Sequence, residues 1–305
     1  MAPDTASRHL GLDLGGTNIK WVVLESDRSI LDQGHEPTLG DEGPDAVTGR
    51  LVAVGRAAVK KWPGVSSVGV GVPGLYYPAT GATRFLVNLP GPWDGFPVGE
   101  RVGEALGLPT HLINDARAFG LAELRLGAGR GAETMVGFVM GTGIGGVVAV
   151  HGRVLQGHDG TAGELGHQTI DPDGPSCGCG NRGCLESFVR ADRIAEACGA
   201  TSAAEAEDKA RAGDARALQG MQQLGRYLGI GIGNTIVSVT PDKVVIGGGV
   251  AGALDLLLPT IWDELRRRVH VTSLDAVQIV PAQLGTWAGA IGAAIHGAEK
   301  ATGVG

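Results

Sequence analysis

Three cysteines within eight residues constrain this 305-residue chain more than any other feature of its sequence. Cys177, Cys179 and Cys184 follow His167 in the glycine-rich segment Cys-Gly-Cys-Gly-Asn-Arg-Gly-Cys. One imidazole and three thiolates make the closed tetrahedral ligand set of a structural zinc site. The glycines permit the tight chain path that brings the thiolates onto one ion. Such clustering in an intracellular chain indicates a metal rather than disulfides, so we predict a zinc-bound loop.

Composition and charge exclude several classes of protein. Hydrophobic residues make up 43% of the chain, enough for a substantial core. No apolar run approaches the roughly 20 residues of a membrane helix, and the first nine residues lack the apolar stretch of a secretory signal. We therefore expect a soluble, cytoplasmic protein. The net charge of -7 and the absence of an extended basic patch disfavour nucleic-acid binding.

Two glycine-turn hairpins organise the chain. Residues 9–14 and 19–24 are apolar segments joined by Gly-Gly-Thr, a pattern typical of a β-hairpin. Residues 135–140 and 147–150 repeat this form around a second glycine-rich turn. The repetition indicates a duplicated α/β fold with a cleft between its halves. Further segments are expected as strands (65–72, 110–113, 243–246, 277–281) and as helices (45–62, 115–124, 251–269, 285–297), with surface helices over 191–228.

Three glycine-rich loops follow predicted strands and are candidates for nucleotide binding. The first is the turn after Asp13, where glycines let the backbone approach a polyphosphate and a threonine adds a hydroxyl donor. Asp13 can hold Mg²⁺ directly or through water, although the Lys-Ser/Thr ending of a Walker loop is absent. Each loop alone also suits an ordinary turn, and the three together favour a nucleotide. Their members are Gly15, Gly16, Thr17, Asn18 and Lys20, then Gly141, Thr142 and Gly143, then Gly247, Gly248 and Gly249.

Asn114-Asp115 stands at the end of a predicted strand and before a predicted helix. A carboxylate in this place can accept the proton of a hydroxyl that attacks phosphorus, and phosphoryl transfer needs little else beyond positioning and charge neutralisation. The same pair is also a good helix N-cap. From these residues alone the cap is the favoured interpretation.

The predicted zinc loop has a second consequence for the side chains around it. Glu164 lies three residues before His167, and Glu186 lies two residues after Cys184. A metal-bound imidazole keeps one ring N–H as a donor, and carboxylates accept hydroxyl hydrogens. We therefore expect a rigid polar pocket for a sugar. A catalytic zinc is excluded, because four protein ligands leave no open position.

Three motifs taken in order resemble the ROK family of repressors and sugar kinases, over about residues 11–297. They are Asp13-Leu14-Gly15-Gly16-Thr17, then Glu164-Leu165-Gly166-His167, then the cysteine segment. The segment Asn88-Leu89-Pro90-Gly91-Pro92-Trp93 is most similar to bacterial glucokinases. The resemblance implies a two-lobed actin-like (ribonuclease-H-like) ATPase fold carrying the zinc loop. We place the smaller lobe at residues 1–116 together with a C-terminal helix at about 290–305, and the larger lobe at residues 117–289.

The resemblance also implies an activity and its residues. ATP, Mg²⁺ and a sugar would meet in the cleft, with Asp115 as the catalytic base and Asp13 serving Mg²⁺ and phosphate. The expected reaction is phosphorylation of a hexose, with glucose to glucose 6-phosphate as the leading candidate. Members of the family are commonly homodimers or homotetramers. Sugar contacts are implied for Gly74, Asn88, Asn114, Asp115, Glu164, His167 and Glu186.

The chain departs from the family pattern at positions that leave the sugar open. Arg117 stands where the family usually has Asn or Asp, and the loop before Glu164 carries His158 and Asp159. N-acetylglucosamine, N-acetylmannosamine, mannose, fructose, allose or a cyclitol are therefore alternatives to glucose.

Other function classes are disfavoured by the sequence. A sugar-responsive repressor would carry a DNA-binding module before the phosphate turn, which here begins at Asp13, and the chain is acidic. A polymerising or chaperone-like ATPase would have no use for the sugar pocket. A polyphosphate-dependent kinase would lack the cysteine cluster.

Overall fold

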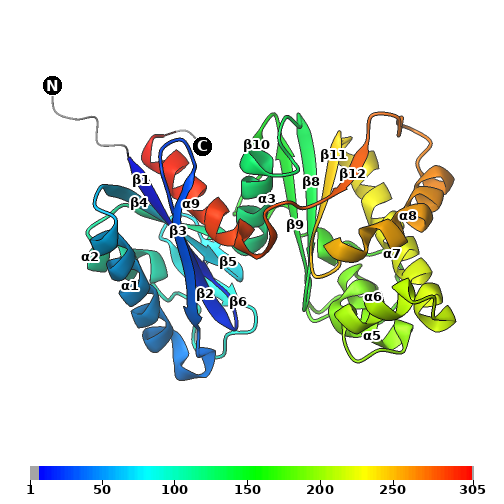
Figure 1. Cartoon of the computed structure of the whole chain (residues 1–305), viewed down its shortest axis with the longest axis horizontal. Helices are drawn as coiled ribbons and strands as arrows, with labels where there is room; N and C mark the ends of the chain where they lie inside the picture. Colours follow the sequence, from blue (N-terminus) through cyan, green and yellow to red (C-terminus); the bar gives the residue numbers. More distant parts are fainter. Residues whose placement is uncertain (1–6, 304–305) are drawn as a thin grey trace. The chain divides into compact units, whose positions relative to one another are not determined.

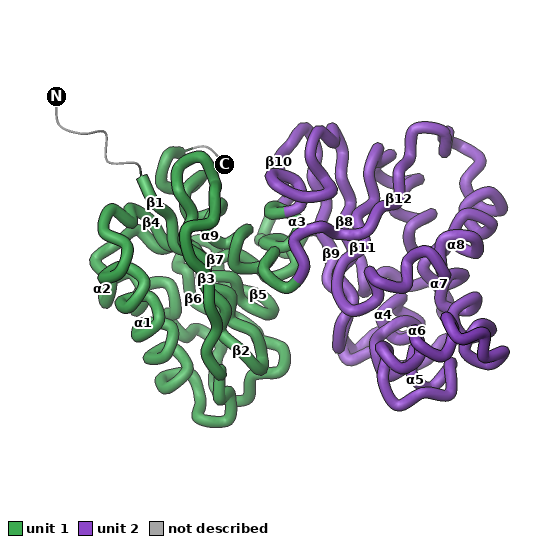
Figure 2. The backbone as a smooth tube through the Cα atoms, viewed as in Figure 1, with its two compact units in different colours: residues 1–122, 156–162, 286–305 green, residues 123–155, 163–285 purple. Residues whose placement is uncertain are grey.

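The computed structural model describes residues 7–303, which divide into two compact units, coloured separately in Figure 2. Unit 1 comprises Met1–Ala122, Gln156–Ala162 and Thr286–Gly305, and unit 2 comprises Glu123–Leu155 and Gly163–Gly285. These units differ from the expected lobes mainly at residues 117–122 and 156–162, which pack with unit 1. The lobe boundaries drawn from the sequence stay a prediction. Within the described residues, no helix is long and apolar enough to cross a membrane.

Unit 1 is built on a five-stranded sheet in the order β3-β2-β1-β4-β7. The sheet contains β1 (Arg8–Leu14), β2 (Asn18–Leu24), β3 (Ile30–Pro37), β4 (Val65–Val72) and β7 (Thr110–Asn114). β2 is antiparallel to both of its neighbours, β1 and β3, while β4 and β7 run parallel to β1. The first predicted hairpin is confirmed, with Asp13 opposite Lys20 and Leu14 opposite Ile19.

Helices cover both faces of this sheet (Figure 1): α1 (Gly43–Lys61) and α2 (Val98–Leu106) on one face, and α9 (Ala288–Ala301) on the other. Successive residues of a strand point to opposite faces. The leucines of β1 therefore join α1 in a hydrophobic core, and Gly11 faces α9. A Cβ at Gly11 would lie 1.9 Å from the Ala290 carbonyl oxygen, and one at Gly69 would lie 1.7 Å from that of Ala293. Glycine thus lets α9 press directly onto the sheet.

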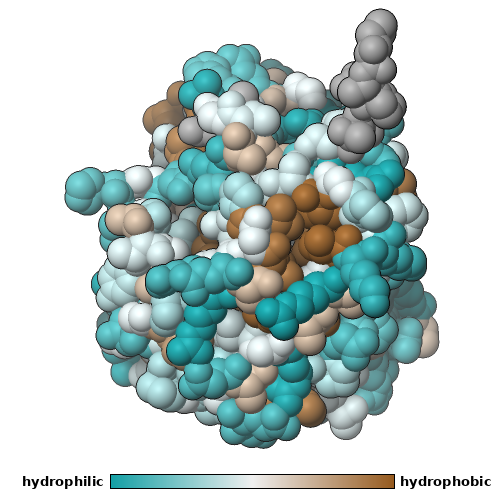
Figure 3. Space-filling model, turned by 90° about the vertical axis from the view of Figure 1, so that its left-hand side faces the viewer, coloured by the Kyte–Doolittle hydropathy of each residue, from teal (hydrophilic) through white to brown (hydrophobic). Residues whose placement is uncertain are grey.

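Unit 1 also contains a small two-stranded sheet of β5 (Gly74–Tyr77) and β6 (Ala82–Leu86), which was not predicted from the sequence. Gly74 has φ 140°, and a Cβ there would lie 2.2 Å from the Phe85 carbonyl oxygen. Figure 3 shows unit 1 from the side that is at the left of Figure 1, where apolar side chains gather in one area surrounded by hydrophilic ones.

Unit 2 repeats the sheet topology of unit 1. Its strand order is β10-β9-β8-β11-β12, formed by β8 (Thr134–Met140), β9 (Ile144–Val150), β10 (Arg153–Val154), β11 (Lys243–Gly248) and β12 (Gln278–Pro281). Three antiparallel strands are again followed by two strands parallel to the first. The duplication predicted from the two glycine-turn hairpins is confirmed at the level of topology.

The helices of unit 2 include α4 (Glu186–Val189), α5 (Ala191–Cys198), α6 (Ala203–Arg211), α7 (Ala215–Val239) and α8 (Leu254–Arg268). The prediction of surface helices over 191–228 is wrong for α7, whose Leu224 and Leu228 are buried in the core of the unit. Its glycines allow close packing, since a Cβ at Gly225 would lie 2.9 Å from the Leu257 carbonyl oxygen of α8. Helix α3 (Asp115–Leu126) begins in unit 1 and ends in unit 2.

Candidate functional site

Asp13 lies near the carboxyl end of β1, where the first glycine turn begins. Burial raises the pKa of its carboxyl group to about 6, an effect that the opposite charge of Lys20 partly offsets. A Cβ at Gly289, in the first turn of α9, would lie 2.5 Å from the Asp13 Oδ2 atom. A larger residue at position 289 would force the Asp13 carboxylate to shift from its place beside the start of the helix.

The turn after Asp13 is closed by backbone bonding from Gly15 N to the Asn18 carbonyl oxygen (3.0 Å). Thr38 is buried and donates its hydroxyl to the Gly15 carbonyl oxygen (2.6 Å). Sequence reasoning missed Thr38, because β3 carries too few apolar residues to be predicted as a strand. Asn88 lies close to the same turn, since a Cβ at Gly16 would be 3.2 Å from the Asn88 Cβ atom. The structure thus brings a predicted phosphate turn and a predicted sugar contact together.

Asn114 and Asp115 lie where β7 ends and α3 begins. Asn114 Oδ1 accepts the Arg117 backbone N–H (3.1 Å), so Asn114 acts as the helix cap. Asp115 Oδ1 accepts from the Asn114 Nδ2 (3.0 Å) and from the Ala116 backbone N–H (2.8 Å). Asn114 Nδ2 also donates to the Gly74 carbonyl oxygen (3.0 Å). Asn114 therefore provides the helix cap that the sequence predicted for the Asn114-Asp115 pair, and it orients the Asp115 carboxylate.

Parallel pairing places these groups at one edge of the unit 1 sheet. Asp13 on β1 is level with Gly71 on β4, and Val72 on β4 is level with Asn114 on β7. Ligands of open α/β sheets bind at the carboxyl ends of parallel strands. The residues that the structure brings to this edge are Asp13, Gly15, Gly16, Gly74, Asn88, Asn114 and Asp115.

The four predicted zinc ligands gather at one point of unit 2. One ligand atom from each of His167, Cys177, Cys179 and Cys184 lies within 4.8 Å of the others. The Cys179 and Cys184 Sγ atoms are 3.7 Å apart, and Cys177 Sγ is 3.6 Å from His167 Nδ1. Tetrahedral zinc with Zn–S bonds of about 2.3 Å separates its sulfurs by about 3.8 Å. The ligand atoms therefore fit a zinc ion closely.

Two glycines give this cluster its shape. A Cβ at Gly166 would lie 2.2 Å from the Ile144 carbonyl oxygen, so glycine lets the Glu164–His167 segment lie against β9. Gly183 has φ 64°, and a Cβ there would lie 1.5 Å from the Asp171 carbonyl oxygen. Substituted side chains at either position would displace the ligands that flank them.

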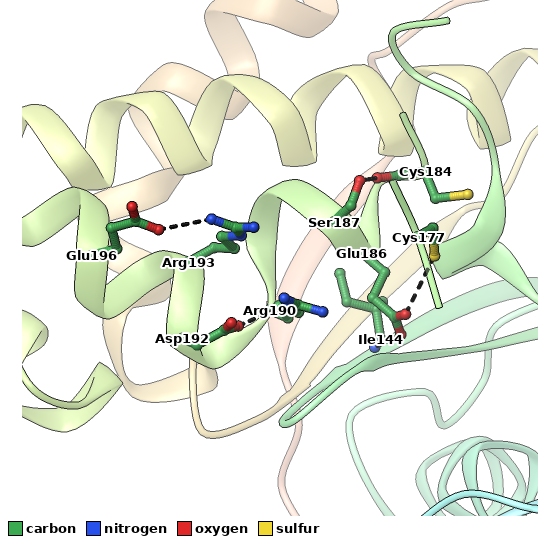
Figure 4. A network of polar contacts seen from close by, with 9 residues as sticks. All are labelled: Ile144, Cys177, Cys184, Glu186, Ser187, Arg190, Asp192, Arg193 and Glu196. Atoms are coloured by element: carbon green, nitrogen blue, oxygen red, sulfur yellow. Dashed lines mark hydrogen bonds and ion pairs between the residues drawn. The ribbon is translucent and has the colours of Figure 1, made fainter. Parts of the chain in front are cut away.

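Glu186 connects the cluster to the second glycine turn (Figure 4). Its Oε2 atom accepts the Ile144 backbone N–H (2.8 Å), and its Oε1 atom is 3.7 Å from the Cys177 thiol. A Cβ at Gly143 would lie 2.4 Å from Glu186 Oε2. The predicted sugar contact Glu186 is thus held between the metal cluster and the predicted phosphate loop.

The third glycine loop lies beside the second. β11 pairs with β8 so that Gly248 is opposite Met140, the residue before the Gly141-Thr142-Gly143 turn. Gly248 has φ 82°, and Gly249 N donates to the Met140 carbonyl oxygen (2.9 Å). Unit 2 thereby places both of its predicted phosphate loops at one edge of its sheet.

The departures from the family pattern have structural roles. Arg117 is buried, and its Nε and Nη2 atoms donate to the Ala162 carbonyl oxygen (2.9 and 2.6 Å). Asp159 accepts the backbone N–H of Thr161 (3.2 Å) and its hydroxyl (2.5 Å), while His158 is exposed. Arg117 and Asp159 therefore both shape the loop that leads to Glu164.

A protein-family model described as the ROK family matches residues 9–299. The chain belongs to the ROK family. A glucokinase of Halalkalibacterium halodurans is 33% identical over 311 residues, covering 93% of each chain. An N-acetylmannosamine kinase of Escherichia coli is 31% identical over 279 residues, covering 88% of this chain and 92% of that enzyme. A xylose repressor of Bacillus spizizenii is 27% identical, covering 94% of this chain and 76% of the repressor.

Solved structures of ROK proteins share the fold. The ROK hexokinase from Thermus thermophilus superposes with a TM-score of 0.86 at 35% identity, covering 97% of this chain and 99% of that one. A ROK glucokinase from Streptomyces griseus, in complex with glucose and AMPPNP, gives 0.82 at 27% identity, covering 96% and 100%. The mixed α/β fold of ROK sugar kinases, of the actin-like ATPase type, is thereby established for this chain.

Proposed function

We propose that this chain is an ATP-dependent hexose kinase that converts glucose to glucose 6-phosphate, with Asp115 as general base. The observation that carries the proposal is the placement of Asp13 and Asp115 at one edge of the unit 1 sheet, beside a glycine turn that suits phosphate. The similarity to glucokinases over nearly the whole chain supports the choice of substrate.

In the proposed reaction the 6-hydroxyl oxygen of the sugar attacks the γ-phosphorus of ATP. A new O–P bond forms as the bond to the ADP oxygen breaks, and the hydroxyl proton passes to the Asp115 carboxylate. The two hydrogen bonds to Asp115 Oδ1 hold this carboxylate in one orientation before the sugar arrives. Asn114 contributes one of them and is therefore a positioning residue for the base.

Asp13 is the proposed residue for Mg²⁺, which would supply charge neutralisation on the phosphates. Its buried carboxylate suits a cation, since a nearby positive charge favours the ionised form that burial disfavours. The glycine loops are proposed to bind ATP through their backbone N–H groups: Gly15, Gly16, Thr17, Asn18 and Lys20, Gly141, Thr142 and Gly143, and Gly247, Gly248 and Gly249.

The cluster of His167 and the three cysteines is proposed to bind structural zinc. The ion would offset the cost of ionising the buried thiols, since burial raises the pKa of Cys184 to about 12. With Nδ1 toward the metal, His167 keeps Nε2 for a sugar hydroxyl. We propose sugar contacts also for Gly74, Asn88, Asn114, Glu164 and Glu186. The cytoplasmic location and the homo-oligomeric state expected from the sequence stay predictions.

The test is an ADP-release assay with ATP, Mg²⁺ and a panel of glucose, mannose, fructose, N-acetylglucosamine and N-acetylmannosamine. We expect the highest kcat/KM for glucose. The similarity to an N-acetylmannosamine kinase supports the second candidate, which a preference for that sugar would establish. Sugar binding without ADP release from any sugar would contradict the kinase and favour the regulator, in line with the similarity to a xylose repressor.

A further inference from the structure

A pocket of about 580 Å³ lies entirely within unit 1, apart from the predicted sugar and phosphate residues. It is formed by the β5–β6 turn, the first turns of α2, the start of β7, the end of α9, and Gln156. Asp115 follows the carboxyl end of β7, whereas this pocket uses the amino-terminal residues of the strand. Its volume falls within the roughly 300–1,000 Å³ of small-molecule sites.

Three basic side chains meet at this pocket. His111 comes from β7, and His296 and Lys300 come from α9, four residues apart and so on one face of the helix. His296 is 6% exposed. Among residues 7–303, none of the three has a carboxylate within 4 Å of its nitrogens. Within this described part of the chain, none of the three side chains is therefore held in an ion pair.

The three basic groups lie close enough to affect one another's pKa values. Burial, with a smaller effect from the charges of Lys300 and His111, lowers the pKa of His296 to about 4, although a backbone hydrogen bond to Leu112 acts in the opposite direction. Burial and Lys300 also lower the pKa of His111. Tyr76 and Glu100 are the other ionisable groups that line the pocket. An anion bound among these bases would relieve their repulsion and favour protonated histidine.

We propose that this pocket binds the phosphate group of a small phosphorylated polyol or sugar through Lys300, His296 and His111. Three nitrogen-bearing side chains that line one pocket suit the three terminal oxygens of a phosphate monoester better than the two of a carboxylate. The pocket is larger than a phosphate ion, and Thr80 and Gln156 offer polar partners for an organic body. Glu100 would accept a hydroxyl hydrogen and repel a second acidic group, which disfavours polycarboxylates.

The pocket shares two elements with the candidate active site. α9 carries His296 and Lys300 at one end and Gly289, which touches Asp13, at the other. β7 carries His111 and ends at Asn114. The proposal concerns binding at this pocket and does not depend on the kinase activity.

The test is isothermal titration calorimetry with ribose 5-phosphate as probe, and with inorganic phosphate and citrate as comparisons. We expect ribose 5-phosphate to bind the whole chain with at least tenfold higher affinity than citrate. Lys300→Ala should weaken this binding at least tenfold, whereas Lys60→Ala, which removes an exposed lysine on α1 of the same unit, should leave it unchanged. Lys300 is exposed, so its replacement spares the core.

A second readout separates the pocket from the glycine loops, which also suit phosphate. Calorimetry in buffers of different ionisation enthalpy measures the protons taken up on binding, and we expect uptake in the wild type but not in His296→Asn. The affinity for ribose 5-phosphate should also rise from pH 8 to pH 6. Equal affinity of the wild type and Lys300→Ala, or citrate binding as tight as ribose 5-phosphate, would overturn the proposal. Asp115→Asn should bind ribose 5-phosphate with wild-type affinity. Loss of kinase activity can therefore be told apart from loss of binding at the pocket.

Discussion

The buried guanidinium of Arg117 clasps the carbonyl oxygen of Ala162 with two donors, Nε at 2.9 Å and Nη2 at 2.6 Å. The carbonyl lies two residues before Glu164, a proposed sugar contact. The backbone N–H of the same arginine is bonded to Asn114, which orients Asp115. The Arg117 side chain, on the helix that carries the proposed base, therefore fixes the position of Ala162, just before the proposed sugar contact Glu164.

Removal of this clasp should affect sugar affinity more than turnover. We expect Arg117→Ala to raise the KM for glucose about tenfold, the scale of a lost charge-assisted hydrogen bond to a carbonyl, with a smaller fall in kcat. Arg117→Lys, which keeps one donor, should recover part of the loss. Arg56→Ala is the matched control, because Arg56 donates to the Ala105 carbonyl oxygen on the surface of the same unit. Steady-state kinetics at saturating ATP measure both constants, and an unchanged KM in Arg117→Ala would refute the positioning role.

Zinc content tests the cysteine cluster directly. Purified protein should contain one zinc ion per chain by elemental analysis, and Cys179→Ser should lose it, because three ligands hold the ion too weakly. Cys198→Ser should keep the full amount, since that thiol is buried on α5 and bonds to the Ala217 carbonyl oxygen. A wild-type protein without zinc would show that the cluster of His167 and the three cysteines does not bind this metal.

His296 predicts acid sensitivity of the fold. Its folded-state pKa of about 4 lies below the ordinary value of 6.5, so the unfolded chain binds more protons between these pH values. Stability should therefore fall as the pH drops through this window, by up to roughly 3 kcal/mol from this group. His296→Gln should flatten the dependence. Urea unfolding at pH 7 and pH 4.5 gives the change in the free energy of unfolding for each protein. The same change in the wild type and in His296→Gln would show that His296 is not the source of the acid sensitivity.

Glu123 should be among the most costly acidic side chains to neutralise. It is fully buried, and its carboxylate accepts backbone N–H groups from Ala128 (2.8 Å), Gln283 (3.0 Å) and Leu284 (2.8 Å). In Glu123→Gln one oxygen becomes a donor that faces N–H groups, so we expect a loss of about 2 kcal/mol or more in the free energy of unfolding. Exposed Glu133→Gln is the control. A difference below 0.5 kcal/mol, in the range of ordinary surface changes, would contradict this reading.

Sequence patterns predicted the parts of the fold that depend on local chemistry. The alternation around Gly15 and Gly141 gave both hairpins, and the cysteine spacing gave the ligand cluster that the structure assembles. Local sequence patterns could not reveal features of the fold that depend on contacts with residues far away in the chain. α7 looked like a surface helix, because its glycines and alanines hide how closely α8 packs on them, and β3 was missed because it has little apolar character.

In the candidate site, too, local patterns identified residues but not the contacts that these residues make with distant parts of the chain. Asp115 looked like a helix cap until the structure gave the capping bond to Asn114 Oδ1. The role of Arg117 depends on Ala162, 45 residues away, and no local pattern contains that pairing. The His111, His296 and Lys300 pocket likewise joins residues from β7 and α9.

The turnover of Asp115→Asn decides whether the Asp115 carboxylate is the general base. The amide keeps the size of the side chain and a hydrogen-bond acceptor at Oδ1 but cannot take the hydroxyl proton. We predict a fall in kcat of at least a hundredfold, the lower end of general-base contributions, with glucose and ATP affinities within about threefold of wild type in calorimetry. If the variant releases ADP from ATP and glucose at a near wild-type rate, Asp115 is not the general base.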